Sequence, residues 1–131
     1  MNFFLWRACT NSIPTMLNLH KHRIVSSSVC SLCREREESV LHALWSCEGI
    51  SLVWGSCFAS LPFEFSRVSS FSDLLDLVFH SSLNSEVFAM TCWAIWNRRN
   101  KVRVGEEVLP LSEVAGVAHQ QLQEFRQVLL C

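Results

Sequence analysis

The sequence predicts a mainly α-helical protein. Its 131 residues include four glycines and three prolines, few for an all-β chain with many turns. Half of the residues are hydrophobic, enough for a packed core in a chain of one domain's length. Several stretches repeat their apolar residues at helical spacing. We therefore expect a small helical domain with a metal-stapled loop and helix, then a long helix and a C-terminal amphipathic helix.

Two short helices are expected before residue 24. Asn11 and Ser12 interrupt the first apolar pattern, and Pro14 suits the start of the second helix. Leu17 and Leu19 continue the apolar face of that helix. The side chains expected to face the core from the first helix are Phe4, Leu5, Trp6 and Ala8.

A third helix is expected within residues 34–47. Its apolar residues recur at helical spacing, and Glu35, Glu37 and Glu38 near its start complement the helix dipole. The next apolar stretch, residues 49–63, is ambiguous between helix and strand, and we favour a short helix through Trp54.

The second half of the chain predicts three more helices. Ser72 is expected to cap the first, and Asn84 or Ser85 to cap the longest, which Gly105 ends. The last helix begins near Ser112 and is amphipathic and exposed enough to be an appendage. The tryptophans at helical spacing are expected in the core: Trp6, Trp45, Trp54, Trp93 and Trp96.

Three cysteines and one histidine form a compact pattern, C-x2-C-x8-H-x4-C. Cys30, Cys33, His42 and Cys47 are the thiol and imidazole ligands that zinc takes in a tetrahedral, closed, structural site. The same residues are also compatible with buried thiols and a core histidine. An iron–sulfur cluster fits less well because it usually needs four cysteines. We expect the remaining cysteines to be small apolar fillers: Cys9, Cys57, Cys92 and Cys131.

The charge of the chain and its motifs narrow the possible classes of function. The net charge is −1, without the basic excess of a stand-alone nucleic-acid binder. Two basic clusters, 20–23 and 98–103, could contact phosphates or simply stay solvated at helix ends. The side chains that would make those contacts are Lys21, Arg23, Arg98, Arg99 and Lys101. No activating motif accompanies a pair such as Cys57 and His80, so catalysis is not expected.

Residues 3–58 resemble the zinc-binding domain that follows the reverse transcriptase in plant non-LTR (LINE-type) retrotransposons. The matching residues run in the family's order: Phe4-Leu5-Trp6-Arg7, Ile13-Pro14-Thr15, Asn18-Leu19, Arg23, Cys30, Cys33, Glu38-Ser39, His42, Cys47 and Val53-Trp54. Ser31 replaces the usual proline after the first cysteine, and Ala43-Leu44 replaces Leu-Phe. Neither position is a ligand. The resemblance implies one structural Zn²⁺ held in CCHC order by Cys30, Cys33, His42 and Cys47.

The segment 92–104 is similar to the W-x-x-W-x-x-R-N run between that zinc domain and an RNase H domain. It contains Trp93, Trp96 and Arg99-Asn100. We therefore expect a zinc-binding domain at 1–60 and a helical connector at 61–131, truncated before RNase H. Neither polymerase nor RNase H catalytic residues accompany it, so we expect no enzyme activity.

The expected function is that of a non-catalytic zinc-binding module from a retroelement polyprotein, assisting RNA or DNA template binding. The alternative is a zinc-stapled protein-interaction module, or a retroelement remnant, without nucleic-acid activity. The expected partners are RNA or DNA and the parent element's reverse transcriptase or RNase H domains, with no membrane and no small-molecule substrate. Because the chain has neither an export signal nor an apolar run of membrane-spanning length, we expect an intracellular location, nucleus or cytoplasm.

Overall fold

The structure is a computed structural model that describes residues 2–58 and 61–130. Within these ranges the chain is helical, with loops and one isolated β-bridge, as the sequence predicts. None of the helices in the described ranges is long and apolar enough to cross a membrane. The α-helices are α1 (Asn2–Cys9), α2 (Met16–Lys21), α3 (Ser51–Cys57), α4 (Phe71–Phe79), α5 (Ser85–Arg103) and α6 (Val114–Leu130). Four single turns of helix, η1 (His42–Ser46), η2 (Glu48–Ile50), η3 (Phe63–Ser66) and η4 (Leu111–Glu113), connect them.

The helix ends follow local side-chain chemistry. The Asn84 side chain accepts hydrogen bonds from the N–H groups of Glu86 and Val87 and caps α5, which confirms one of the two predicted caps. Gly105 follows the end of α5 with φ +80°, a left-handed conformation that favours glycine. The predicted cap of α4 is wrong by two residues, because Ser70 and not Ser72 accepts from the Asp73 N–H.

The helix expected within residues 34–47 is present only over residues 40–46. Residues 31–39 form a loop and turns, and the helical part begins at Val40 and continues as the wide turn η1. Glu37 pairs with Val29 in an antiparallel bridge. The three glutamates therefore do not lie in the first turn of a helix, and that expectation is wrong.

Aromatic rings fill the centre of the molecule around Phe88, which is fully buried in α5. The Phe88 ring centroid lies 5.3 Å from that of Trp54, 6.0 Å from that of Trp45 and 6.1 Å from that of Phe71. Two indole N–H groups in this cluster have partners: Trp54 donates to the Leu44 carbonyl and Trp45 to the Phe65 carbonyl. Segments before and after residue 60 thus share one core.

Three of the five tryptophans contribute to the core as expected. Trp54 and Trp96 are buried in it, and the half-buried Trp45 packs against it. Trp93 is half-buried but is not among the residues packed against this core, so its predicted place there is not confirmed. Trp6 is 61% exposed on α1, where its ring stacks on that of Phe3. The expectation for Trp6 is therefore wrong.

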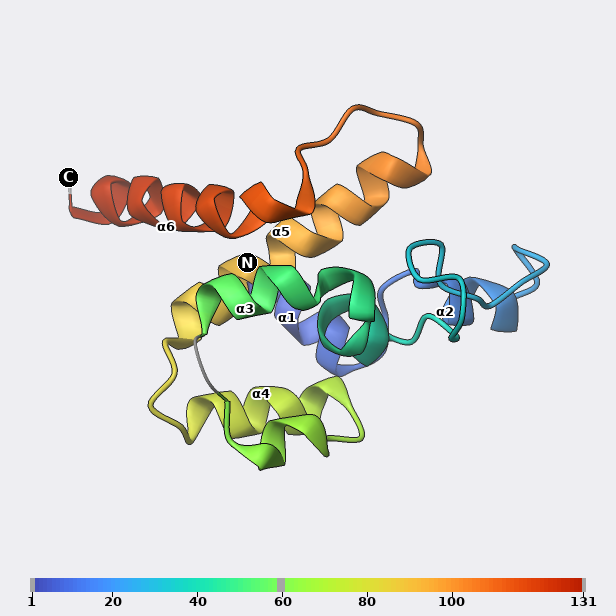
Figure 1. Cartoon of the computed structure of the whole chain (residues 1–131), viewed down its shortest axis with the longest axis horizontal. Helices are drawn as coiled ribbons and strands as arrows, with labels where there is room; N and C mark the ends of the chain where they lie inside the picture. Colours follow the sequence, from blue (N-terminus) through green and yellow to red (C-terminus); the bar gives the residue numbers. More distant parts are fainter. Residues whose placement is uncertain (1, 59–60, 131) are drawn as a thin grey trace.

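The C-terminal helix α6 is an integral part of the fold. It packs along α5 and also contacts α3 (Figure 1). Buried small and branched side chains make this contact: Val114, Ala115, Ala118 and Leu122. The idea of an appendage is therefore wrong.

The filler cysteines fit their predicted role, since Cys92 is buried and Cys9 and Cys57 are half-buried, whereas Cys131 lies outside the described residues.

Candidate metal centre

A short hairpin presents the first two candidate ligands. The Glu38 N–H donates to the Ser28 carbonyl at 2.9 Å, and the Cys30 N–H donates to the Arg36 carbonyl at 2.8 Å. Arg34 closes the turn with φ 59°, in the left-handed region. These bonds hold Cys30 and Cys33 on one tight loop, with Cys30 2% exposed and Cys33 half-buried.

The wide turn η1 presents the other two ligands. In an α-helix, residues five apart point about 140° away from each other, so His42 and Cys47 would not converge. Here the Cys47 N–H donates to the His42 carbonyl at 3.0 Å, an i to i+5 bond that closes a π-type turn. Cys47 then adopts an extended conformation. This local geometry turns both side chains toward the hairpin.

The four candidate ligand atoms converge as the sequence predicts. One ligand atom from each of Cys30, Cys33, His42 and Cys47 lies within 4.8 Å of all the others. The sulfurs of Cys30 and Cys47 are 3.9 Å apart, and the Cys33 sulfur lies 3.3 Å from His42 Nε2.

These spacings match a tetrahedral zinc site. With Zn–S bonds of about 2.3 Å and Zn–N bonds of about 2.0–2.1 Å, a tetrahedron separates two sulfurs by about 3.8 Å and a sulfur and a nitrogen by about 3.5 Å. The residue types and the spacing of their donor atoms therefore fit one zinc ion. With protein atoms at all four positions, a bound zinc ion would have none open for a substrate, as in structural zinc sites.

Backbone N–H groups of the hairpin and of η2 point at two of the cysteine sulfurs. The N–H groups of Glu35 and Arg36 point at the Cys33 sulfur and lower the pKa of that thiol. The Gly49 N–H points at the Cys47 sulfur. Such contacts to the sulfur atoms stabilise the ionised form, which is the form that binds metal.

Burial shifts the pKa values of His42 and Cys47 in opposite directions. It lowers the pKa of His42, which keeps the imidazole neutral and able to bind a metal at neutral pH. Burial raises the pKa of the Cys47 thiol to about 12. In the metal-free chain Cys47 therefore carries a proton that zinc must displace.

Gly49 allows the hairpin to approach the segment after Cys47. A Cβ atom on Gly49 would lie 2.6 Å from Cγ and Cδ2 of Leu32, one of the two residues between the first two ligands. A larger residue at position 49 would therefore force the Leu32 side chain to move. Leu32 and Gly49 carry no metal-binding atom, and the ligand pattern alone gives no indication of this contact.

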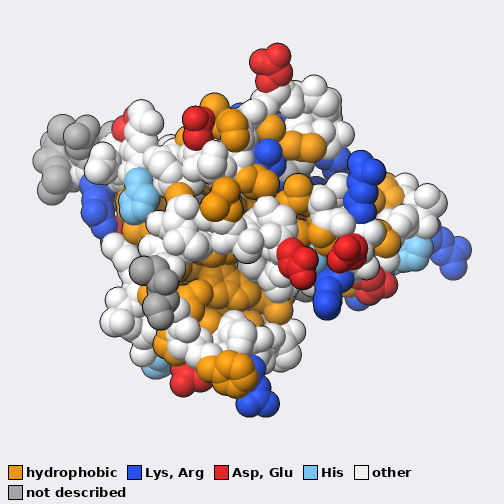
Figure 2. Space-filling model, in the orientation of Figure 1, with side chains coloured by type: hydrophobic (Ala, Val, Ile, Leu, Met, Phe, Trp, Pro, Cys, Tyr) orange, Lys and Arg blue, Asp and Glu red, His pale blue; other side chains and the backbone are white. Residues whose placement is uncertain are grey.

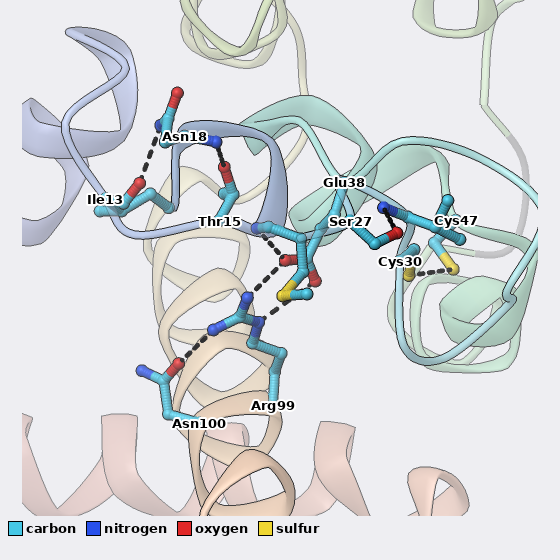
Figure 3. A network of polar contacts seen from close by, with 11 residues as sticks. Ile13, Thr15, Asn18, Ser27, Cys30, Glu38, Cys47, Arg99 and Asn100 are labelled. Atoms are coloured by element: carbon cyan, nitrogen blue, oxygen red, sulfur yellow. Dashed lines mark hydrogen bonds and ion pairs between the residues drawn. The ribbon is translucent and has the colours of Figure 1, made fainter. Parts of the chain in front are cut away.

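Glu38 joins the metal-binding segment to two helices (Figure 3). Its carboxylate accepts hydrogen bonds from the Met16 N–H at the start of α2 and from Arg99 on α5. Arg99 lies over the Trp96 ring, 4.6 Å from its centroid, and also donates to the Asn100 side chain. Glu38 is 2% exposed, so it acts as a buried acceptor and not as a helix-start residue.

The five predicted nucleic-acid contacts lie in two parts of the fold. Lys21 and Arg23 are exposed at and just beyond the end of α2, while the other three lie on α5. Arg98 donates through Nε to the Leu109 carbonyl, and Arg99 is held internally by Glu38, which leaves Lys101 as the exposed cation of the three. Figure 2 shows the Lys and Arg side chains scattered over the visible face, without one continuous basic patch.

Comparison with known families agrees with the metal-binding geometry. Residues 1–54 match the model of a family described as zinc-binding in reverse transcriptase, and this range contains all four ligands. Over these residues the chain thus carries a zinc-binding domain of the reverse-transcriptase type, which confirms that part of the resemblance. Neither a curated protein nor a solved structure shows a significant match to the chain.

Proposed function

We propose that the chain is a zinc-stabilised, non-catalytic module that assists RNA or DNA binding by a retroelement reverse transcriptase. The observation that carries this proposal is the convergence of three thiols and one imidazole inside the segment similar to that family. The ion would fix the hairpin of Cys30 and Cys33 against the turn of His42 and Cys47. Its role would be to hold the chain in shape, with no step of chemistry at the metal.

The second half of the chain would be the connector that precedes RNase H in plant LINE-type elements. The Glu38–Arg99 pair supports this assignment, because it joins a residue of the zinc-domain pattern to a residue of the W-x-x-W-x-x-R-N pattern. A connector that packs against the zinc domain would transmit the position of the metal site to the following domain. Residues 61–131 would then act together with residues 1–60.

The test is a titration of the zinc-loaded chain with short single-stranded RNA and DNA at several salt concentrations. Phosphate contacts release counterions, so we expect the affinity to fall steeply between about 50 and 200 mM salt. Lys21→Glu and Arg23→Glu are expected to weaken binding, because both side chains are exposed. An affinity too weak to detect even at low salt would contradict a role in nucleic-acid binding.

A protein-interaction module is the second candidate. It is favoured by exposed aromatic side chains on α1, where Phe3 is 69% and Trp6 61% exposed and the two rings stack. Figure 2 also shows a hydrophobic hollow on the visible face. Between α3 and η3, Trp45, Trp54 and Phe65 help to line a cavity of about 450 Å³. A zinc-loaded chain that binds no nucleic acid would favour this reading.

A further inference from the structure

A cavity separate from the metal centre lies between α5, the loop at residues 104–110 and the start of α6. Its volume of about 350 Å³ falls within the range of about 300–1,000 Å³ common for small-ligand pockets. None of the four metal ligands lines it. Figure 1 shows the loop arching away from the end of α5 and returning to the start of α6, so three segments contribute to the walls.

One wall of the cavity is aromatic and the facing wall is aliphatic. The half-buried indole of Trp93 lines it from α5, and Val114 and Val117 line it from α6. An indole face is a good surface for stacking a planar ring, and it accepts every nucleobase because each has a π-face. The apolar part of the cavity therefore suits a flat heterocycle.

Amide side chains supply hydrogen-bonding groups in the same cavity. Asn97 lines it one helical turn after Trp93, and Gln121 lines it from α6. The Gln121 Oε1 atom is buried and has no hydrogen-bond partner within the described part of the chain. A buried acceptor without a partner is costly, and rotation of this amide into the cavity would let Oε1 accept from a ligand N–H group and relieve that cost. Amide groups can both donate to and accept from the edge of a base.

Two cations and one carboxylate line the cavity. Arg98 uses its Nε atom to hold the Leu109 carbonyl at 2.8 Å, which fixes the guanidinium beside the loop. Its terminal nitrogens carry further N–H donors. Lys101 is exposed, and Glu107 on the loop is the opposing charge. Two positive charges against one negative leave the cavity with a formal charge of +1, which favours a phosphate.

We propose that this cavity binds one nucleotide of a single-stranded RNA or DNA. The base stacks on Trp93, its edge meets the amides of Asn97 and Gln121, and its phosphate lies at Arg98 and Lys101. This proposal rests on the proposed function and assigns it a location. Trp6, whose ring is exposed on α1, is a competing stacking surface outside this cavity.

The experiment uses the zinc-loaded full chain and a short oligouridylate containing 5-iodouridine. Photocrosslinking followed by peptide mass spectrometry is expected to place the crosslink at Trp93. Fluorescence anisotropy with the same oligonucleotide is expected to show a loss of about fivefold to 150-fold in affinity for Trp93→Leu, the usual effect of losing one stacked base. Trp93→Phe keeps a ring for stacking and is expected to restore most of the affinity, which a mere loss of fold would not do.

The charge test compares two exposed cations. Lys101→Glu is expected to weaken binding and to reduce the slope of log affinity against log salt by about 0.7. Arg67→Glu makes the same charge change just after η3, away from the cavity, and is expected to leave both the affinity and the salt slope unchanged. Crosslinks at Trp6, or equal losses in both charge variants, would overturn the cavity assignment while the proposed function stands. A wild-type chain that binds no oligonucleotide would overturn both.

Discussion

The Arg99 guanidinium on α5 donates two hydrogen bonds to the Glu38 carboxylate, 61 residues earlier in the chain. Both side chains are largely buried, at 3% and 16% exposed for Glu38 and Arg99. Buried charges are costly unless they are paired and hydrogen-bonded. The pair therefore fixes the relative position of the metal-binding segment and the long helix more than it adds net stability.

Glu38→Ala is expected to destabilise the zinc-loaded chain by about 3–5 kcal/mol, because it leaves a buried guanidinium without its partner. It also removes the acceptor of the Met16 N–H. Urea unfolding would measure the loss. The control is Glu86→Ala, which breaks the exposed pair of Glu86 and Arg126 and is expected to cost at most about 1 kcal/mol. Equal losses would show that burial does not distinguish the two pairs.

Cys33→Ser is expected to abolish stoichiometric zinc binding, since it removes one of four thiolate or imidazole ligands. Apparent free energies of structural zinc are about 10–16 kcal/mol near neutral pH, so the hairpin should lose its order as well. Native mass spectrometry and amide exchange over residues 28–38 would report the two effects. Cys57→Ser is the matched control, because Cys57 lies outside the cluster and shares a hydrogen bond with the Thr91 hydroxyl. Equal metal loss in both variants would mean that the ligands are assigned wrongly.

Zinc is expected to change how stability depends on pH. Burial raises the pKa of Cys47 from 9.0 to about 12, so the folded metal-free chain favours the thiol. The stability that the folded metal-free chain gains from keeping this thiol protonated is complete below pH 9, and it is lost as the pH rises from about 9 to about 12. Zinc binds the thiolate, so the loaded chain should not show this alkaline loss.

At acid pH, stability depends on pH with the opposite sign. Burial lowers the pKa of His42 from 6.5, so the folded chain favours the neutral ring, and stability falls as the pH drops below about 6.5. Protons also compete with zinc for the ligands, so zinc should dissociate on acidification. Thermal unfolding from about pH 5 to 12, with zinc and with a chelator, measures both windows. Burial also raises the pKa of Cys9, Cys57 and Cys92, so part of the alkaline loss is expected to remain in Cys47→Ser. An alkaline loss in Cys47→Ser as large as in the metal-free wild type would contradict the assignment to Cys47.

Asn84→Ala is expected to cost about 1 kcal/mol, within a range of about 0.5–2, because it removes the side chain that caps α5. Ser72→Ala provides the comparison at an exposed serine that caps nothing in the structure, and its effect should stay within about 0.5 kcal/mol. Ser70→Ala should behave like Asn84→Ala. A large effect at Ser72 would place the start of α4 where the sequence alone suggests it.

Local signals predict much of this fold. The Asn84 cap, the end of α5 near Gly105 and the four metal ligands each depend on neighbouring residues or on ligand spacing, which the sequence displays. The Ser70 cap is harder to predict, because three serines precede Asp73 within four residues and several of them could start a helix.

Relationships across the chain are harder to predict. Glu38 looks like a residue of a helix start, and its real partner is far away in sequence, so no spacing rule points to it. The π-type turn of η1 is equally hard to predict, because the apolar pattern at Val40, Leu41 and Leu44 also fits an α-helix. Trp6 follows the expected helical pattern, yet its side of α1 has no element packed over it sufficient to bury the ring.

The shared core has a practical consequence for anyone who isolates the metal-binding part. A fragment ending at residue 60 would keep every ligand but would lose Phe88, the ring against which Trp45 and Trp54 pack. It would also leave the Glu38 carboxylate without its guanidinium partner. The segment that contains all four candidate ligands is therefore shorter than the segment that packs around one core.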